Sequence, residues 1–284
     1  MVGLVGLMPT AVAANETTNG TITGTEVWSG SHTLTGSVIV ATGANLIVQP
    51  GTTVTMPNGT VIDVRGGLCA GDVACGANGM ASNSSRITFN WQDPANASAT
   101  GSCAGIFNNN HYNRDPSCNE GILLRSTVDV GATKLNHVSI TNAYGMPRWV
   151  SEISEVRYGA IVAEGSSPTM TGLKFTGINT TSLLILDLGR PDIIGGEFTV
   201  GDDETSLVGS AIQAYGAGSV LQPLMINSPV FTGTEKGCGQ NDDGRHVLWV
   251  EESFVSVQNA VIMNGDYGIR LDDSAGHVSS STIE

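Results

Sequence analysis

The sequence predicts an all-β protein whose short strands stack into a single parallel solenoid with three strands in each coil. Apolar segments end at Val40, Val48, Met56 and Val64, and each step is eight residues, so three steps make one coil of 24 residues. A repeat of short strands at a fixed period is typical of solenoids. The amino-acid composition also favours a β-solenoid, because 37 glycines and only 13% charged residues suit strands joined by tight corners better than helices.

The N-terminal segment predicts export. Residues 1–14 are apolar and end in the small residues of Ala11-Val12-Ala13, which is typical of a secretion signal before its cleavage site. The positive charges that open such a signal are missing, so we interpret the segment as a truncated signal peptide, with a hydrophobic strand as the alternative. Residues 15–30 are predicted to be a polar lead-in. No later segment has the ~20 apolar residues of a membrane span, so we expect a secreted or cell-surface protein.

The chain is acidic, with a formal net charge of −14 at pH 7 and a sequence pI of about 4.6. An acidic surface repels nucleic acids and anionic lipids, so the sequence excludes both as partners. Solubility alone explains such a surface, and cation binding is the alternative with functional consequences.

Five cysteines also fit an oxidising compartment. Cys69 and Cys75 bracket a short glycine-rich insertion, and Cys103 and Cys118 bracket a longer polar one. We therefore expect the disulfides Cys69–Cys75 and Cys103–Cys118, with Cys238 unpaired within this sequence.

Predicted turns carry six Asn-x-Ser/Thr sequons, which support export and are candidate glycosylation sites. These asparagines are Asn15, Asn19, Asn58, Asn83, Asn96 and Asn179. A chain rich in Asn and Thr also produces some sequons by chance, so their occurrence in turns is what favours sugar attachment.

The regular coils begin at residue 31, and we expect the solenoid to extend over 31–284 with four inserted loops. The insertions are 69–84, 92–120, 144–157 and 234–245. A strand at 86–89 separates the first two insertions, and Trp149 lies in the third. Residues 279–284 stop inside a coil, so we expect the C-terminal end of the solenoid to be incomplete.

Five strands of the later coils align by their apolar pattern, at 160–164, 183–187, 211–215, 247–251 and 268–272. Side chains alternate between the two faces of a strand. The residues predicted to face the core are Ile161, Leu184, Ile212, Leu248 and Ile269. The residues predicted to face outward are Val162, Ile185, Gln213, Trp249 and Arg270, followed in the same strands by Glu164, Asp187, Tyr215, Glu251 and Asp272.

Strand openings of the form Gly-Ile-x-Leu, as at Gly121 and Gly268, and Gly or Asn corners after the third strand carry a resemblance to a known family. Over 31–284 the pattern resembles the right-handed parallel β-helix of the pectin-lyase-like superfamily, and residues 28–66 resemble the opening coils of uncharacterised secreted β-helix repeat proteins. The resemblance implies a right-handed solenoid and a saccharide groove on the outer face of the first sheet. It implies no single activity, because the superfamily includes lyases, hydrolases, phage tailspikes and non-enzymatic surface proteins.

The outward residues predict a ligand site on this face. Trp249 and Tyr215 are candidates to stack on sugar rings, while Arg270 and Gln213 are candidates to bond hydroxyl groups. Calcium is the alternative ligand, because hard cations prefer several carboxylate oxygens. The candidate calcium ligands are Glu164, Asp187, Glu251 and Asp272. The interpretation without a functional role is that these acids are ordinary solvated turn residues.

The sequence supports a catalytic site less than it supports a ligand site. Neighbouring carboxylates at Glu251 and Asp272 have the approximate separation that a glycosidase uses. Arg270 is the one candidate for the basic residue of a polysaccharide lyase. Partial matches to the acidic and His-containing motifs of polygalacturonases occur at Asn241-Asp242-Asp243 and Gly276-His277. The spacing between these matches differs from the spacing in that family.

The sequence therefore predicts a non-catalytic, extracellular β-helix that acts in adhesion, carbohydrate or ligand binding, or envelope structure. A polysaccharide lyase or glycoside hydrolase working along the first-sheet groove is one alternative, and a structural spacer of a longer surface protein is the other. No cofactor is required, calcium being the one candidate. The expected partners are glycans, polysaccharides or other cell-surface components.

Overall fold

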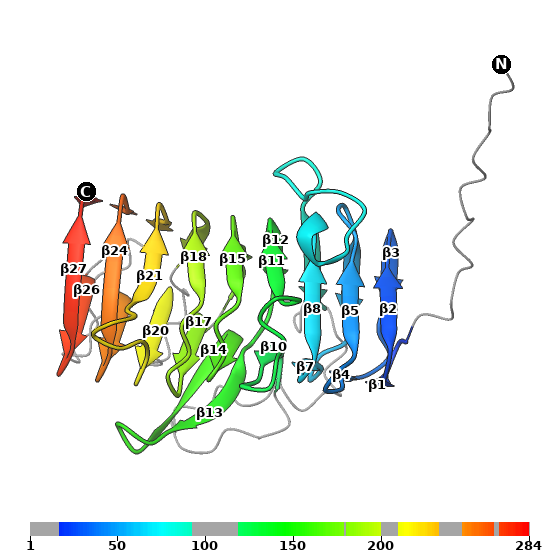
Figure 1. The fold of residues 1–284 in the computed structure, drawn as a ribbon, viewed down its shortest axis with the longest axis horizontal. Helices are drawn as coiled ribbons and strands as arrows, with labels where there is room; N and C mark the ends of the chain where they lie inside the picture. Colours follow the sequence, from blue (N-terminus) through cyan, green and yellow to red (C-terminus); the bar gives the residue numbers. More distant parts are fainter. Residues whose placement is uncertain are drawn as a thin grey trace, which may run out of the picture.

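Three parallel β-sheets run along the computed structural model, and each coil of the chain contributes one strand to each sheet (Figure 1). The structure describes residues 17–92, 119–178, 180–199, 210–232, 246–263 and 267–283. Within them, nine coils follow one another in sequence order along every sheet, which confirms the parallel β-solenoid predicted from the repeat and the right-handed β-helix that the resemblance implied.

The strands of the three sheets are as follows. The first sheet contains β1 (Gly20–Ile22), β4 (Val38–Val40), β7 (Val61–Val64), β10 (Gly121–Leu124), β13 (Met146–Val150), β14 (Glu155–Glu164), β17 (Thr181–Leu186), β20 (Ile212–Tyr215), β23 (His246–Glu251) and β26 (Tyr267–Asp272). The second contains β2 (Thr25–Trp28), β5 (Asn45–Val48), β8 (Gly67–Ala70), β11 (Lys134–Asn136), β15 (Thr169–Thr171), β18 (Asp192–Ile194), β21 (Leu224–Asn227), β24 (Phe254–Gln258) and β27 (Ala275–Ser279). The third contains β3 (Ser31–Thr33), β6 (Thr53–Met56), β9 (Ile87–Trp91), β12 (Val138–Thr141), β16 (Lys174–Thr176), β19 (Glu197–Thr199), β22 (Val230–Thr232), β25 (Val261–Met263) and β28 (Thr282–Ile283).

The 24-residue repeat is visible in the strand register. Val40 of β4 lies beside Val64 of β7, one full coil later, and Val38 lies beside Ile62. All four side chains are fully buried. A register that keeps apolar positions above one another buries a continuous aliphatic row, and this burial is the main stabilisation of a solenoid.

Aromatic side chains reinforce the core along the third sheet. Phe175, Phe198 and Phe231 stack on successive coils, with ring centroids 5.2 and 5.5 Å apart. Each is almost completely buried. This separation is typical of favourable aromatic pairs, so the three rings add a specific contact between successive coils to the aliphatic packing.

The predicted insertion at 144–157 is a β-hairpin and not an irregular loop. Strands β13 and β14 pair antiparallel, and the second half of β14 then joins the first sheet as a parallel strand. Figure 1 shows the hairpin extending along one edge of the molecule. It covers part of the outer face of the first sheet, where seven buried residues form a second, smaller core: Leu123, Met146, Val150, Val162, Leu184, Leu186 and Tyr215.

Two boundaries differ from the sequence prediction. Strands β1 and β2 lie within residues 15–30, so the first coil begins inside the predicted polar lead-in. Cys69 is the third residue of β8, so the first insertion begins after Ala70 and not at residue 69. Strands β1 and β2 are short and leave most of their positions exposed or half-buried, so they give little apolar signal. Strand β8 is buried, but its sequence Gly-Leu-Cys-Ala contains only one large aliphatic residue to mark it.

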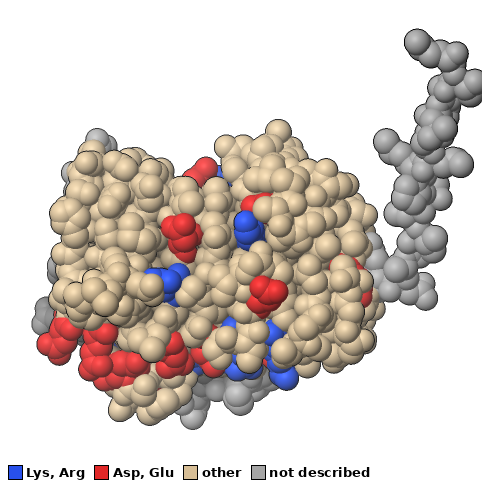
Figure 2. Space-filling model, in the orientation of Figure 1, with Lys and Arg blue, Asp and Glu red and all other residues tan. Residues whose placement is uncertain are grey.

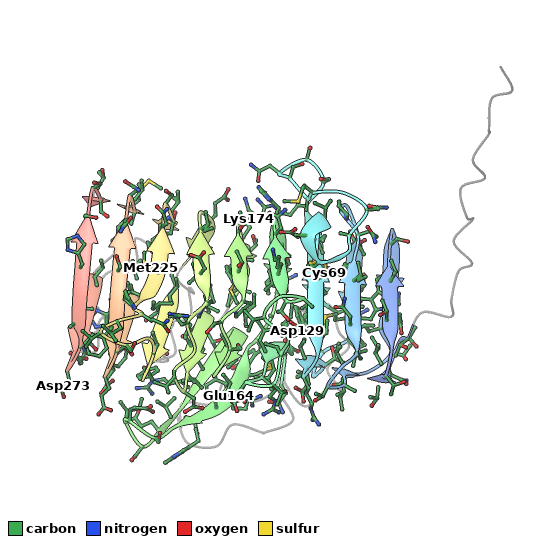
Figure 3. The ribbon with its side chains drawn as sticks, in the orientation of Figure 1. Cys69, Asp129, Glu164, Lys174, Met225 and Asp273 are labelled. Carbon is green, nitrogen blue, oxygen red and sulfur yellow. A yellow bond between two sulfur atoms is a disulfide. The ribbon has the colours of Figure 1, made fainter. Side chains whose placement is uncertain are left out.

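The expected disulfide Cys69–Cys75 is present and closes the start of this insertion (Figure 3). The 3-10 helix η1 (Val73–Cys75) lies inside the closed segment and is capped by the Asp72 side chain. Cys103, Cys118 and Cys238 lie outside the described residues. Among the described residues, no helix is long and apolar enough to cross a membrane.

Candidate functional site

The first sheet positions most of the predicted site residues, but one of its strands is displaced by a residue relative to the prediction. Leu183, and not Leu184, lies beside Ile161 and Ile212 in the inner row. Ile185 consequently belongs to the main core, and Leu184 faces outward beneath the hairpin. Because side chains alternate, a slip of one residue exchanges the two faces of the strand.

The same displacement removes Asp187 from the expected column of acids. Leu186 occupies its place beside Glu164. Asp187 lies after the end of β17, exposed at a corner with a φ of 54°. Partial desolvation of its carboxyl group, followed by the charges of Glu152 and Glu164, raises the pKa of Asp187.

Trp249 points away from the core as predicted, with Leu248 inside, but it is only 7% exposed. Its indole ring lies 5.3 Å from the guanidinium carbon of Arg157 and 4.5 Å from that of Arg270. The indole N–H donates to Asp272 at 3.1 Å. The expectation that Trp249 is exposed is therefore wrong, because Arg157 and Arg270 lie over its ring in cation–π contacts within the protein.

Tyr215 and Gln213 are completely buried, so neither offers a surface to a ligand in this structure. The Tyr215 hydroxyl accepts a hydrogen bond from Nε of Arg157 at 3.1 Å. Burial raises the pKa of Tyr215 to about 12, against the opposing effect of the arginine. Arg157 comes from the hairpin, which the sequence did not place over this strand.

The carboxylates of Glu251 and Asp272 come from neighbouring strands in direct register. The Asp272 carboxylate also accepts a hydrogen bond from Nε of Arg270. Nη1 of the same arginine lies 3.3 Å from Nε2 of His246. Glu251 has one buried carboxylate oxygen with no hydrogen-bond partner among the described residues. Burial, followed by the charge of Asp272, raises the pKa of Glu251.

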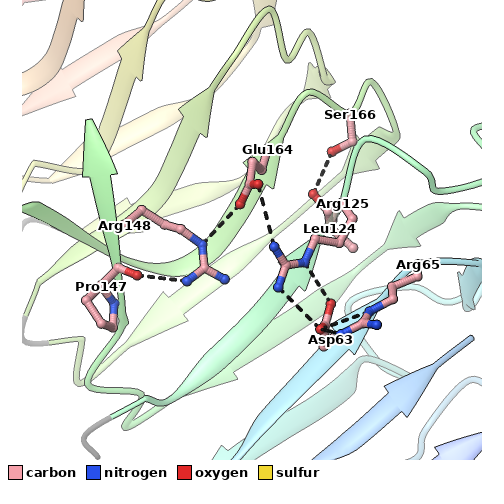
Figure 4. A network of polar contacts seen from close by, with 8 residues as sticks. All are labelled: Asp63, Arg65, Leu124, Arg125, Pro147, Arg148, Glu164 and Ser166. Atoms are coloured by element: carbon pink, nitrogen blue, oxygen red, sulfur yellow. Dashed lines mark hydrogen bonds and ion pairs between the residues drawn. The ribbon is translucent and has the colours of Figure 1, made fainter. Parts of the chain in front are cut away.

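Glu164 belongs to a network of ion pairs that fastens the hairpin to the first sheet (Figure 4). Its carboxylate lies 3.1 Å from Nε of Arg148 in the hairpin and 3.6 Å from Nη1 of Arg125. Arg125 and Arg65 both bond Asp63. Burial opposes ionisation of Asp63, but the hydrogen bonds from Arg125 and Arg65 keep its pKa below the ordinary value.

The four candidate calcium ligands do not assemble into one site. Glu164 and Asp272 are held by arginines, and Asp187 lies at a corner apart from their row. Within the described part of the chain, no three His, Cys, Asp or Glu side chains are arranged to hold a metal ion.

The outer face of the hairpin carries an aromatic surface that sequence reasoning missed. Trp149 is 63% exposed and lies opposite Val156, which is also exposed. Pro147 lies opposite Tyr158 one pair further along the same face. We call these four residues the hairpin platform. The sequence places Trp149 in a predicted insertion, and this was the one signal that could have pointed to the surface. The pairing that brings the four residues together could not be derived without the register of the two hairpin strands.

The inner face of the hairpin is anchored. Met146 and Val150 are buried in the second core, and Arg148 and Arg157 bond Glu164 and Tyr215 below. The alternation of the strands therefore gives the hairpin one face fixed on the first sheet and an outer face on which Trp149 and Val156 are exposed to solvent. A platform held in this way loses little conformational entropy when a ligand binds.

Two candidate glycosylation sites are exposed, Asn19 and Asn83. Asn58 is half-buried, with its side-chain oxygen enclosed. Asn15, Asn96 and Asn179 lie outside the described residues.

The geometry defines the protein as a parallel β-helix with a hairpin packed on its first sheet. Comparison of the chain with models of protein families, with curated proteins and with solved structures finds no match.

Proposed function

We propose that this chain is an extracellular, non-catalytic β-helix of the pectin-lyase-like type that binds carbohydrate through its hairpin platform, in adhesion or at a cell envelope. The observation that carries the proposal is the 63% exposure of Trp149 on a hairpin whose other face is immobilised. A large aromatic side chain left in water on a fixed element is unusual and marks a contact surface.

Carbohydrate is the ligand that suits this surface. The apolar face of a sugar ring packs on the face of an indole or phenol, and surrounding polar groups bond the hydroxyls. Trp149 supplies an exposed ring, Tyr158 is a half-buried ring on the same face, and Ser151 and Glu152 supply polar groups at the adjoining turn.

The contacts of the first-sheet acids favour binding over catalysis. Glu164 is neutralised by two arginines and Asp272 by Arg270, while Trp249 is enclosed between guanidinium groups. Groups held in this way stabilise the hairpin and the last coils. Their charges are already paired within the protein, so they need no substrate as a partner.

A glycan array with matched variants tests the proposal. We expect Trp149→Ala to weaken glycan binding by about tenfold or more, and Trp149→Phe to retain part of it. Val130→Ala removes an aliphatic side chain of 48% exposure from a different turn and serves as the control. Binding that survives Trp149→Ala, or the absence of any bound glycan, would contradict the proposal, and the second outcome favours a spacer.

One observation supports a second candidate function, a glycoside hydrolase acting at Glu251 and Asp272. A carboxyl with a raised pKa beside an ion-paired carboxylate is the division of roles that acid–base catalysis requires. Release of reducing ends from polysaccharides that is abolished by Glu251→Gln would favour this candidate. Turnover that is unchanged in that variant would exclude it.

A further inference from the structure

A closed turn in the connection between β20 and β21 presents two aliphatic side chains to solvent. The backbone N–H of Ser219 donates to the carbonyl of Gln222 at 2.8 Å, and the N–H of Gln222 donates back at 3.1 Å. The two residues between them, Val220 and Leu221, are 73% and 92% exposed. Turn centres are normally Gly, Pro, Asn, Asp or Ser, so apolar side chains here are unexpected on structural grounds.

A third aliphatic side chain lies on the preceding coil. Leu188 is 72% exposed, and its backbone N–H donates to the carbonyl of Gly216, at the start of the same turn, at 2.9 Å. Leu188 has a φ of 64°, a conformation that leucine rarely adopts. Two neighbouring coils thus expose large aliphatic groups at one corner of the solenoid. We call Leu188, Val220 and Leu221 the aliphatic ridge.

Acidic residues surround the ridge. Asp187 precedes Leu188, and Glu152 of the hairpin turn reaches Gly216, where an added Cβ would lie 2.6 Å from its Oε1. The corners of the next two coils carry the exposed Glu252 and Asp273. Figure 2 shows acidic side chains gathered along the lower left edge of the molecule, and Figure 3 marks Asp273 at the end of that edge.

We propose that the aliphatic ridge is a docking surface for a protein partner whose apolar pocket is bordered by lysine and arginine. The ridge supplies apolar anchors, and the surrounding acids supply the charge that such a border complements. A second copy of this chain is disfavoured as the occupant, because each copy carries a net charge of −14 and the same acids at this corner. An anionic lipid surface is disfavoured for the same reason.

The test uses the full chain and a peptide library displayed on phage. Selection on the wild-type chain, with counter-selection on the double variant Val220→Ser and Leu221→Ser, should enrich peptides that combine Lys or Arg with Leu, Ile or Phe. A synthetic peptide of the enriched sequence should bind the double variant about tenfold more weakly or worse, and added salt should weaken its binding to the wild type. Val130→Ser, at an exposed position of another turn, should leave its affinity unchanged.

Three results would overturn the proposal. The first is a selection that enriches no such peptides, and the second is an enriched peptide that binds the double variant as tightly as the wild type. The third is binding of the chain to phosphatidylcholine vesicles that is lost in the double variant, which would make the ridge a membrane-inserting element. Circular dichroism checks that the variants remain folded, as expected for exposed positions. The outcome does not depend on whether the hairpin platform binds glycans.

Discussion

The Tyr215 hydroxyl lies 3.1 Å from Nε of Arg157, and this hydrogen bond joins the hairpin to a strand that begins 55 residues after Arg157 in the chain. The two residues meet in a buried region beside Trp249. The contact fixes the inner face of the hairpin, and it explains why the expected ligand residues of the first sheet are covered. It also leads to a measurable dependence of stability on pH.

Tyr215 should make the protein less stable in alkaline solution. Its pKa is raised from 10.0 to about 12 in the folded state, so the folded state binds more protons than the unfolded state between these values. The free energy of unfolding therefore falls as pH rises through this window, and no such loss from Tyr215 occurs below it. Urea unfolding at a series of pH values measures the slope.

Tyr215→Phe should remove that slope while lowering stability at neutral pH by about 2 kcal/mol, because Arg157 loses a hydrogen-bond acceptor. Tyr158→Phe, at a half-buried position on the outer face of the hairpin, is the matched control and should keep the slope. An equal slope in the wild type and in Tyr215→Phe would show that another group is responsible.

The two tryptophans of the site should differ sharply in their contribution to stability. Trp249 is 7% exposed and Trp149 is 63% exposed. We expect Trp249→Ala to lower the free energy of unfolding by about 3–5 kcal/mol, and Trp149→Ala by less than about 0.5 kcal/mol. Thermal or chemical unfolding of both variants measures the difference. Equal destabilisation would mean that Trp149 packs against the protein and is not available to a ligand.

Glu120 should act as an anchor at the base of the hairpin. Its buried carboxylate accepts hydrogen bonds from the backbone N–H groups of Gly59 and Tyr144, each at 2.9 Å. Glu120→Ala leaves these donors without their acceptor and should cost about 2–4 kcal/mol. Glu120→Gln keeps one acceptor oxygen and should cost less, as chemical unfolding would show.

Burial raises the pKa of Glu120 despite the two hydrogen bonds to its carboxylate. The folded state therefore holds this proton more tightly, and its contribution to the free energy of unfolding decreases as pH rises from the ordinary carboxyl pKa of 4.5 to the folded value. Glu120→Gln should abolish this part of the pH dependence. A pH profile identical to that of the wild type would contradict the assignment.

The disulfide Cys69–Cys75 should stabilise the inserted loop without being required for the solenoid. The bridge closes a loop with a sequence separation of 6. A loop of this size corresponds to about 2 kcal/mol in the chain-entropy description. We expect Cys75→Ser to increase proteolysis of the loop and to leave the β-sheet circular dichroism unchanged. Loss of the β-sheet signal would show that the coils depend on this bridge.

The regular part of the fold was predictable because its signal is local. Val40 and Val64 are one coil apart in the sequence and pair directly in the first sheet, as their spacing predicted. Cys69 and Cys75 bracket a short insertion and are bonded. A fixed period decides the first pairing, which the hydrophobic effect stabilises, and a short sequence separation decides the second, which is covalent.

The face of Trp249 was predictable, but its environment was not. Alternation along β23 places Leu248 inside and Trp249 outside. Whether the outer side chain meets water depends on Arg157, which reaches it from a hairpin 92 residues earlier. The slip at Leu183 is a second example, because an unbroken apolar run carries no alternation that would distinguish its two faces.

The sequence by itself determined the coil, the three strands in each turn of it and the buried aliphatic rows, because these depend on a short repeat and on burial of apolar surface. Only the tertiary structure decided which outward side chains remain accessible. It covered Trp249 and Tyr215 and left Trp149 and Leu221 in solvent. The physical reason is that accessibility is set by segments remote in the chain, whose packing leaves no periodic trace in the residues that they cover.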